Sequence, residues 1–397
     1  MSRIRPFIGK ELIKVLTGIR RSGKSVMLEL IQTELTEQGV SPSQFVRINF
    51  ENMSNAHLRT AEALRKDVAE RIAGISGKAY LFFDEIQEVD GWEKSVNSFR
   101  VEFDCDIYIT GSNAKLLSSE LTTYLAGRYI EFVIYPFSFE EFAKLYTETW
   151  PNTAIQDLFT SYLVFGGMPY ISNLRFETVP SQMYLQELFN SVVLKDIVKS
   201  NKVRDVDLLE RIINFVFANA GSVFSAASIS KYFKNESRVA APETVLNYIN
   251  HCVDAFLFYR VRRQDLQGKK LLAINEKYYV ADHGIREAVY GGNMKAINLI
   301  LENIVFMELL RRGYKVTIGK WGTKEIDFVC ERKNEILYIQ VSYLLASEET
   351  AEREFGAYEA IRDNFPKYVV TLDEFDMSRG GIKHRNIREF LLMPEWN

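Results

Sequence analysis

The residues from Gly18 to Ser25 read Gly-Ile-Arg-Arg-Ser-Gly-Lys-Ser, which matches the pattern G-x-x-x-x-G-K-S/T in full. Glycines at both ends let the backbone curl so that its N–H groups point inward at an anion, and a helix starting near Gly23 adds its positive dipole. In such a loop Lys24 reaches the β- and γ-phosphates, and the Ser25 hydroxyl binds Mg²⁺. The spacing therefore predicts a phosphate-binding loop for a nucleoside triphosphate and Mg²⁺.

The predicted nucleotide contacts extend over the loop and into the helix that follows it. They comprise Gly18, Arg20, Arg21, Ser22, Gly23, Lys24, Ser25 and Val26. Lys24 also counts as catalytic, because its charge meets the phosphoryl group that is transferred. Arg20 and Arg21 add two positive charges near the nucleotide, although their side chains are equally compatible with contacts to a partner or to another domain.

A second motif runs from Tyr80 to Glu85, where an apolar strand ends in two acids. This is the form of a Walker B element, in which Asp84 binds Mg²⁺ and Glu85 orients or deprotonates the attacking water. Adjacent acids at a strand end are also common as solvated turn residues. The apolar residues before them and the upstream loop favour the functional interpretation.

A third apolar run, from Ile107 to Thr110, delivers Gly-Ser-Asn to the end of another strand. Ligands of open α/β sheets bind beyond the carboxyl ends of the strands, so Ser112 or Asn113 is a candidate sensor of the γ-phosphate. A structural turn explains the same residues nearly as well. Arg128 precedes the next strand and is a candidate catalytic cation, in cis or in trans, with a surface ion pair as an equal alternative.

The elements that must position these residues alternate along the first third of the chain. The expected strands are 11–16, 45–50, 80–84, 106–110 and 129–134, and a helix is expected from Lys24 to about Gln38. Alternation of short apolar runs with amphipathic stretches predicts an α/β domain with a parallel sheet over residues 1–146.

The same motifs, with Phe-Asp-Glu-Ile-Gln-Glu-Val followed by Trp92, then Thr-Gly-Ser-Asn and Leu-Ala-Gly-Arg-Tyr, resemble a family of prokaryotic AAA-type ATPases. The resemblance covers essentially the whole chain. It implies a standalone ATP-binding protein whose P-loop domain precedes a winged helix and a C-terminal endonuclease-like domain. It also implies nucleotide binding by Gly18 to Ser25, Walker B roles for Asp84 and Glu85, and a sensor role around Ser112 and Asn113.

The middle of the chain is predicted to be a helical connector over residues 147–204, interrupted by a turn at Gly166-Gly167-Met168-Pro169. Residues 205–292 then show three short helices and two strand-like runs, which is the order of a winged-helix domain. The expected hairpin is basic and makes DNA a candidate partner through Arg260, Arg262, Arg263, Lys269 and Lys270. The expected recognition helix, residues 243–256, contains no Lys or Arg, so a protein contact or nonspecific binding is favoured over sequence reading.

The last segment, residues 293–397, has the order helix, three strands, helix, strand, which is that of a restriction-endonuclease-like core. Glu302, Asp327 and Gln340 fall where that fold places its acids or an amide. An active member needs paired carboxylates for Mg²⁺ and a lysine near the last acid. Gln340 replaces an acid and Ser342 stands where the lysine is expected, so the domain is predicted to be catalytically degenerate. The alternative is that Glu302 and Asp327 are ordinary charged residues at the rim of the domain, without a catalytic role.

Composition limits the remaining possibilities. Hydrophobic residues make up 47% of the chain, and 49 basic against 52 acidic residues give a formal net charge of −3, so no global field attracts nucleic acid or membrane. We expect no secretory leader, no membrane span and a cytoplasmic location. Three dispersed cysteines and four dispersed histidines argue against a disulfide framework or a zinc site.

The fold class expected is therefore multidomain α/β: a P-loop NTPase sheet, a helical and winged-helix region, and an α/β endonuclease-like domain. The leading hypothesis is an ATP-hydrolysing regulatory ATPase whose nucleotide state repositions the later domains. A nucleotide-gated module that binds DNA or a protein with little turnover is the first alternative, and a metal-dependent nuclease is the second. Oligomerisation is compatible with each hypothesis.

Overall fold

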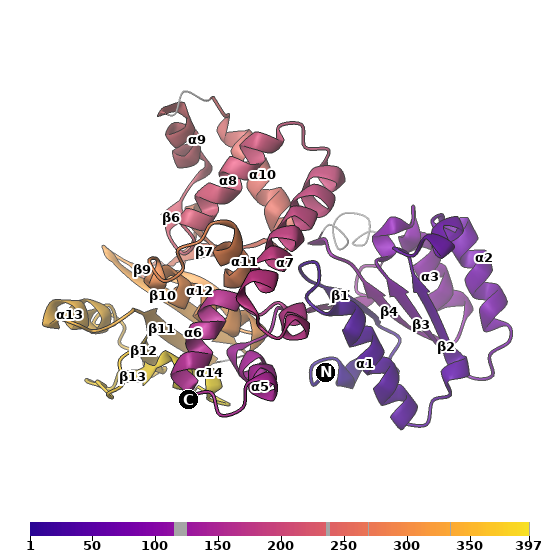
Figure 1. The fold of residues 1–397 in the computed structure, drawn as a ribbon, viewed down its shortest axis with the longest axis horizontal. Coiled ribbons are helices and arrows are strands. Elements are labelled where there is room, and N and C mark those ends of the chain that lie inside the picture. Colours follow the sequence, from indigo (N-terminus) through magenta and orange to yellow (C-terminus); the bar gives the residue numbers. More distant parts are fainter. Residues whose placement is uncertain (115–124, 236–238, 269, 334, 397) are drawn as a thin grey trace. The chain divides into compact units, whose positions relative to one another are not determined.

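A computed structural model describes residues 1–114, 125–235, 239–268, 270–333 and 335–396 of the chain (Figure 1). Contacts divide it into two compact units. Unit 1 comprises Met1–Tyr135 with Asp254–Phe256, and unit 2 comprises Pro136–Val253 with Leu257–Asn397. Each unit is described by itself below.

Unit 1 is built on a parallel five-stranded sheet in the order β2-β3-β4-β1-β5. Its strands are β1 (Ile13–Thr17), β2 (Phe45–Asn49), β3 (Ala79–Asp84), β4 (Cys105–Thr110) and β5 (Tyr129–Val133). Strands buried on both faces need continuous apolar sequences, and β3 is buried at every position. The sheet confirms the P-loop NTPase type of α/β fold.

Helices cover both faces of this sheet (Figure 1). They are α1 (Lys24–Glu37), α2 (Ala61–Ile72) and α3 (Trp92–Glu102), with short 3-10 helices η1 (Arg5–Phe7), η2 (Pro42–Gln44), η3 (Met53–Leu58) and η4 (Ile86–Glu88). On one face Leu81 and Phe83 pack against α2 and α3, and on the other Phe82 packs with α1. Two hydrophobic cores thus hold the strand ends in place.

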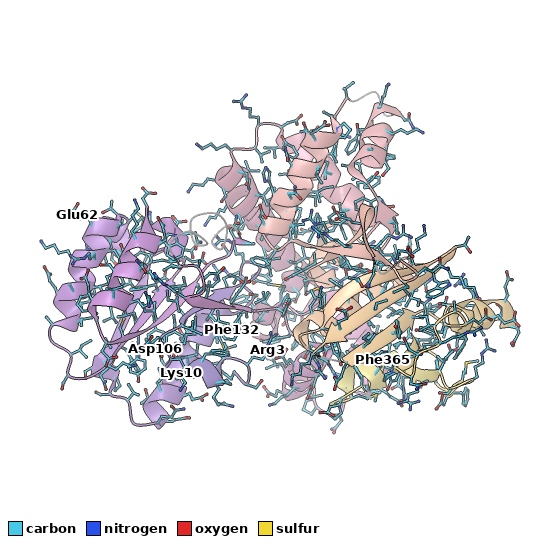
Figure 2. All side chains as sticks on the ribbon, turned by 180° about the vertical axis from the view of Figure 1, so that it is seen from behind. Arg3, Lys10, Glu62, Asp106, Phe132 and Phe365 are labelled. Carbon is cyan, nitrogen blue, oxygen red and sulfur yellow. The ribbon has the colours of Figure 1, made fainter. Side chains whose placement is uncertain are left out.

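A buried ion pair lies at the amino-terminal end of the sheet. The Lys14 ammonium donates to the Asp106 carboxylate, and both side chains are fully buried. Lys14 also donates to the Lys10 carbonyl at 2.6 Å, so Lys10 and Asp106 lie close together (Figure 2). The Tyr108 hydroxyl and the Gly9 N–H each donate to Asp106 at 2.7 Å, so hydrogen bonds compensate the buried charges.

Unit 2 contains most of the helices. They are α5 (Phe139–Thr149), α6 (Ile155–Phe165), η6 (Pro169–Leu174), α7 (Thr178–Ser191), the π-helix η7 (Val192–Lys199), α8 (Val206–Ala218), α9 (Ala226–Asn235), α10 (Pro242–Asp254), α11 (His283–Val289), α12 (Ile297–Arg311), α13 (Glu348–Gly356) and α14 (Ile387–Leu392). Within the described residues, no helix is both long and apolar enough to cross a membrane.

The strands of unit 2 form one eight-stranded sheet in the order β13-β12-β11-β10-β9-β7-β8-β6. They are β6 (Val223–Phe224), β7 (Phe258–Asp265), β8 (Lys270–Val280), β9 (Lys315–Trp321), β10 (Lys324–Arg332), β11 (Glu335–Val341), β12 (Lys367–Thr371) and β13 (Lys383–Asn386).

This sheet contains strands from both residues 205–292 and residues 293–397. The β7–β8 hairpin pairs with the C-terminal strands, because β7 runs parallel to β9 with Arg263 opposite Ile318 and Asp265 opposite Lys320. A hairpin edge carries unpaired N–H and C=O groups, and β9 pairs with the edge of β7 from Arg263 to Asp265. The two segments therefore share one sheet.

The Gly-Gly-Met-Pro segment forms the predicted turn at the end of α6. The Gly167 N–H donates to Oδ2 of Asp282 at 2.7 Å, and a Cβ on Gly166 would collide with the Asp282 carboxylate. Asn293 donates to the carbonyls of Leu163 and His283 at 2.9 Å. The glycines are needed because the turn packs directly against the start of α11.

Candidate nucleotide-binding site

The loop between β1 and α1 follows the carboxyl end of β1, which lies between β4 and β5 in the sheet of unit 1. Gly18 and Gly23 have φ values of 135° and 102°, a region that favours glycine. A Cβ on Gly18 would collide with the Ile134 carbonyl oxygen. Both glycines of the predicted pattern are therefore required by the backbone.

Two side chains of the loop are buried inside it. The Lys24 ammonium donates to the carbonyls of Gly18 at 3.0 Å and Ile19 at 3.2 Å. The Ser22 side chain is 3% exposed, and its hydroxyl has no hydrogen-bond partner in the described part of the chain. Buried polar atoms are nearly always satisfied, so this unpaired hydroxyl fits a loop that binds a phosphate oxygen.

The carboxylate of Asp84, at the end of β3, accepts hydrogen bonds from three side chains. The Ser25 hydroxyl donates to its Oδ2 at 2.7 Å and the Asn49 amide to the same oxygen at 3.2 Å. The Thr110 hydroxyl donates to Oδ1 and accepts from the Glu85 N–H at 2.9 Å. Hydrogen bonds to this one carboxylate therefore connect the first turn of α1 with the ends of β2, β3 and β4.

This arrangement fits Mg²⁺, because hard cations take oxygen ligands and Mg²⁺ keeps several waters. The Ser25 and Asp84 oxygens are adjacent. Among the described residues there is no group of three or more His, Cys, Asp or Glu residues that could hold a metal ion. A cation bound here would complete its shell with water and phosphate oxygens.

Glu85 follows Asp84 with φ 55° and is 8% exposed. Its Oε2 accepts from the Gln87 amide and, at 3.3 Å, from the Ser112 hydroxyl. Burial raises the pKa of the Glu85 carboxyl, and the Lys24 charge acts in the opposite direction. A fixed carboxylate of this kind is suited to accept a proton from water.

The other predicted contacts differ in position. Arg20 pairs with Glu51 at 2.9 Å, and Arg21 occupies a left-handed conformation with φ 66°. Val26 is 55% exposed in the first turn of α1, whereas Asn113 is 9% exposed directly after Ser112. All four lie on segments that follow the carboxyl ends of strands or begin α1.

Arg128 lies at the opposite edge of the sheet. Its carbonyl accepts from the N–H of Ile13, the first residue of β1, whereas the phosphate-binding loop follows the last residue, Thr17. Its guanidinium donates to Asn97 at 3.0 Å. The length of β1 therefore separates Arg128 from the phosphate-binding loop that follows the same strand.

Three contributors to the site were not predicted: Asn49, Thr110 and Gln87. Asn49 and Thr110 are the last residues of β2 and β4, and Gln87 lies in η4 after β3. Thr110 and Gln87 belong to runs that carry the family resemblance, but the sequence assigned neither of them a role. The rule that ligands gather at the carboxyl ends of parallel strands would have identified Asn49 and Thr110.

The acids expected for an endonuclease-like site in unit 2 surround a lysine instead. The Lys277 ammonium lies 2.9 Å from Glu302, 3.0 Å from Glu325 and 3.7 Å from Asp327. Burial and the Glu302 charge raise the pKa of Asp327 to about 8. Gln340 accepts from the Asp327 N–H at 2.7 Å. These acids also line a cavity of about 450 Å³.

The three arginines of the expected basic hairpin have acidic neighbours. Arg263 pairs with Glu325 at 3.0 Å, and Arg260 and Arg262 lie 3.9 and 4.0 Å from Glu276. Lys269 lies outside the described residues, as does the side chain of Lys270. The described part of the hairpin is therefore less positive than its arginine content indicates.

A P-loop before α1, two acids at the end of β3 and a parallel sheet in the order β2-β3-β4-β1-β5 define an AAA-type P-loop ATPase. A family model described as an AAA domain matches residues 10–143, and a model of a domain of unknown function matches residues 156–296.

Two relatives extend the likeness beyond the AAA domain. An uncharacterized protein of Haemophilus influenzae is 37% identical over 371 residues, which cover 94% of this chain and 92% of that protein. An uncharacterized protein of Methanocaldococcus jannaschii is 31% identical over 367 residues, covering 88% and 79%. The chain belongs to the same family as these two proteins.

A solved structure shares the fold. The Walker-type ATPase of Pyrococcus abyssi is 14% identical and superposes with a TM-score of 0.50, covering 72% of this chain and 93% of that chain.

Proposed function

We propose that this protein binds and hydrolyses ATP and uses its nucleotide state to reposition the later domains, as a regulatory ATPase. The observation that carries the proposal is the hydrogen bond between Ser25 and Asp84, which joins the phosphate-binding loop to the acidic strand end. Glu85 is adjacent and buried. Together these residues supply a phosphate site, a metal site and a base.

In the proposed reaction the N–H groups of Gly18 to Ser25 and the Lys24 ammonium bind the phosphates. The unpaired Ser22 hydroxyl donates to a phosphate oxygen. Ser25 and Asp84 would hold Mg²⁺, which neutralises charge on the β- and γ-phosphates when bound. Glu85 accepts the proton of the attacking water, and Asn113 reports on the γ-phosphate.

Arg128 enters this proposal only in trans. Its guanidinium is exposed at the amino edge of the sheet, so it serves a phosphoryl group only when presented to the site of another subunit. The proposal therefore includes an oligomer.

For the rest of the chain we propose a helical connector over residues 147–204, a winged helix over 205–292 and an endonuclease-like domain over 293–397. The order α8, α9, α10 followed by the β7–β8 hairpin supports the winged helix. The Lys277 ammonium among Glu302, Glu325 and Asp327 supports a catalytically degenerate endonuclease-like domain, because a lysine occupies the space between the acids.

ATP turnover of the full chain tests the main proposal. We expect Lys24→Ala to abolish ATP binding and Glu85→Gln to bind ATP while hydrolysing it at least about 100-fold more slowly. Lys66→Ala, a change at an exposed lysine of α2, is the matched control. Hydrolysis that does not depend on Lys24 would refute the assignment.

The second candidate function is a nucleotide-gated binding module with little turnover. It is favoured by α10, whose described surface offers no Lys or Arg for phosphates, which points to a protein partner ahead of DNA. Salt-dependent DNA retention that vanishes when Arg260, Arg262 and Arg263 are neutralised would instead assign the hairpin to DNA.

A further inference from the structure

We propose that Gln87 is a positioning residue for the water that attacks the γ-phosphate, and that it acts together with Glu85. This inference rests on the proposed ATP hydrolysis. It adds a residue that lies outside the phosphate-binding loop and outside the Asp84–Glu85 pair.

The first observation is how Glu85 is held. Its Oε2 accepts hydrogen bonds from the Gln87 side-chain amide and from the Ser112 hydroxyl, the latter at 3.3 Å. Two donors on one oxygen fix the plane of a carboxylate. The other oxygen, Oε1, then faces a defined direction and keeps its lone pairs for water.

The second observation concerns the other end of the same amide. Oε1 of Gln87 is buried and has no hydrogen-bond partner within the described residues. Reversing the amide would place that oxygen against the Glu85 carboxylate, so hydrogen bonding fixes the orientation. A buried carbonyl oxygen needs a donor, and a water molecule has two O–H groups. One O–H would point to Glu85 and the second to Gln87.

The local backbone gives this pair a fixed geometry. Glu85 adopts φ 55°, which is uncommon outside glycine, and its N–H is held by the Thr110 hydroxyl at 2.9 Å. The chain then forms the 3-10 turn η4, in which Ile86 is fully buried. A buried anchor between the two side chains turns Gln87 back toward Glu85.

The chemical step balances with water as the only co-reactant. The water oxygen forms a bond to the γ-phosphorus as the bond from that phosphorus to the β,γ-bridging oxygen breaks. ADP leaves with that electron pair. The proton of the water passes to Glu85, and Gln87 takes up no proton at any stage. Gln87 contributes only the orientation of the water. A displacement of the reacting groups by 1 Å lowers the reaction rate by about 100-fold.

The test uses full-length protein, Mg²⁺ and ATP, with single-turnover rates and ATP dissociation constants measured separately. Gln87→Met keeps the length of the side chain and removes both polar ends, whereas Gln87→Glu keeps an acceptor and loses the donor. We expect both variants to bind ATP as the wild type does and to lower the single-turnover rate by about 10-fold to 100-fold. Glu88→Gln, at the exposed neighbouring position of η4, should leave the rate unchanged.

The outcomes separate this inference from the proposed function. An unchanged or raised rate in Gln87→Met, with Lys24-dependent hydrolysis in the wild type, overturns the role of Gln87 alone. A parallel loss of ATP affinity also overturns it, because a positioning residue changes the rate and leaves binding intact. Wild-type protein without Lys24-dependent hydrolysis refutes the ATPase proposal, and the inference fails with it.

Discussion

The Ser25 hydroxyl and the Asp84 carboxylate are separated by 59 positions in the sequence and by 2.7 Å in the structure. The contact joins the first turn of α1 to the end of β3. Because the Asn49 amide and the Thr110 hydroxyl also donate to Asp84, the carboxylate is oriented by three strand or helix ends before any cation binds.

The charge of Asp84 is the first point to test. Asp84→Asn keeps the acceptor for Ser25 and removes the negative charge, so Mg²⁺-dependent ATP turnover should fall by about 100-fold or more. Nucleotide binding measured without Mg²⁺ should change little. Asp90→Asn, at an exposed position, is the control, and normal turnover in Asp84→Asn would contradict the assignment of the metal ligand.

The Thr110 hydroxyl supports two residues at once, since it donates to Asp84 and accepts from the Glu85 N–H. Thr110→Val keeps the shape and leaves a buried N–H without its acceptor. We expect the free energy of unfolding to fall by about 1–3 kcal/mol, together with slower ATP turnover. Thr33→Val, on the exposed face of α1, should do neither. Full activity in Thr110→Val would show that the hydroxyl is dispensable.

The buried pair of Lys14 and Asp106 predicts a large effect on stability. Lys14→Met removes the ammonium and leaves the Asp106 carboxylate buried, which costs about 3–5 kcal/mol in the free energy of unfolding. Chemical denaturation measures the change. Lys10→Met is a matched control, because Lys10 contributes only its backbone carbonyl. Equal stability of the two variants would show that Asp106 is satisfied by Gly9 and Tyr108 alone.

Asp327 predicts a pH dependence of stability. Its pKa in the folded protein is raised to about 8 from the ordinary value of 3.8, so between these two pH values the folded state holds a proton that the unfolded state releases. The free energy of unfolding should therefore fall as the pH rises from about 4 to about 8, by at most about 1.4 kcal/mol per pH unit.

The control for this dependence is a neutral residue of the same shape. Asp327→Asn should flatten the profile between about pH 4 and about pH 8, the window set by the two pKa values, whereas Glu349→Gln at an exposed position of α13 should leave it unchanged. An unaltered slope in Asp327→Asn would mean that Lys277 keeps Asp327 ionised throughout.

The sequence was sufficient for unit 1 because its signals are local. Buried parallel strands carry continuous apolar runs, so the expected strand over 80–84 agrees closely with β3 (Ala79–Asp84). The motif residues stand at or just after the carboxyl ends of these strands. A parallel sheet brings the carboxyl ends of its strands to the same edge. Lys24, Ser25, Asp84, Glu85 and Ser112 met there for that reason.

Other contacts depend on strand order, which no local pattern encodes. Lys277 reaches Glu302 and Glu325 only because the β7–β8 hairpin joins the C-terminal sheet. The position of Arg128 could have been predicted, since a residue that precedes a parallel strand lies at the amino end of that strand. Gln87 lies in the run from Phe83 to Val89 that carries the resemblance, but its role could not be predicted, because that role depends on the turn after β3.

The pairing of β7 with β9 has a practical consequence for anyone who divides this chain. A fragment ending at residue 292 would keep the hairpin and lose the strand that covers it, leaving the open edge of β7 to recruit another chain. The complementary fragment would expose the edge of β9 in the same way. Both fragments are expected to aggregate, so residues 205–397 should be expressed and engineered as one fragment.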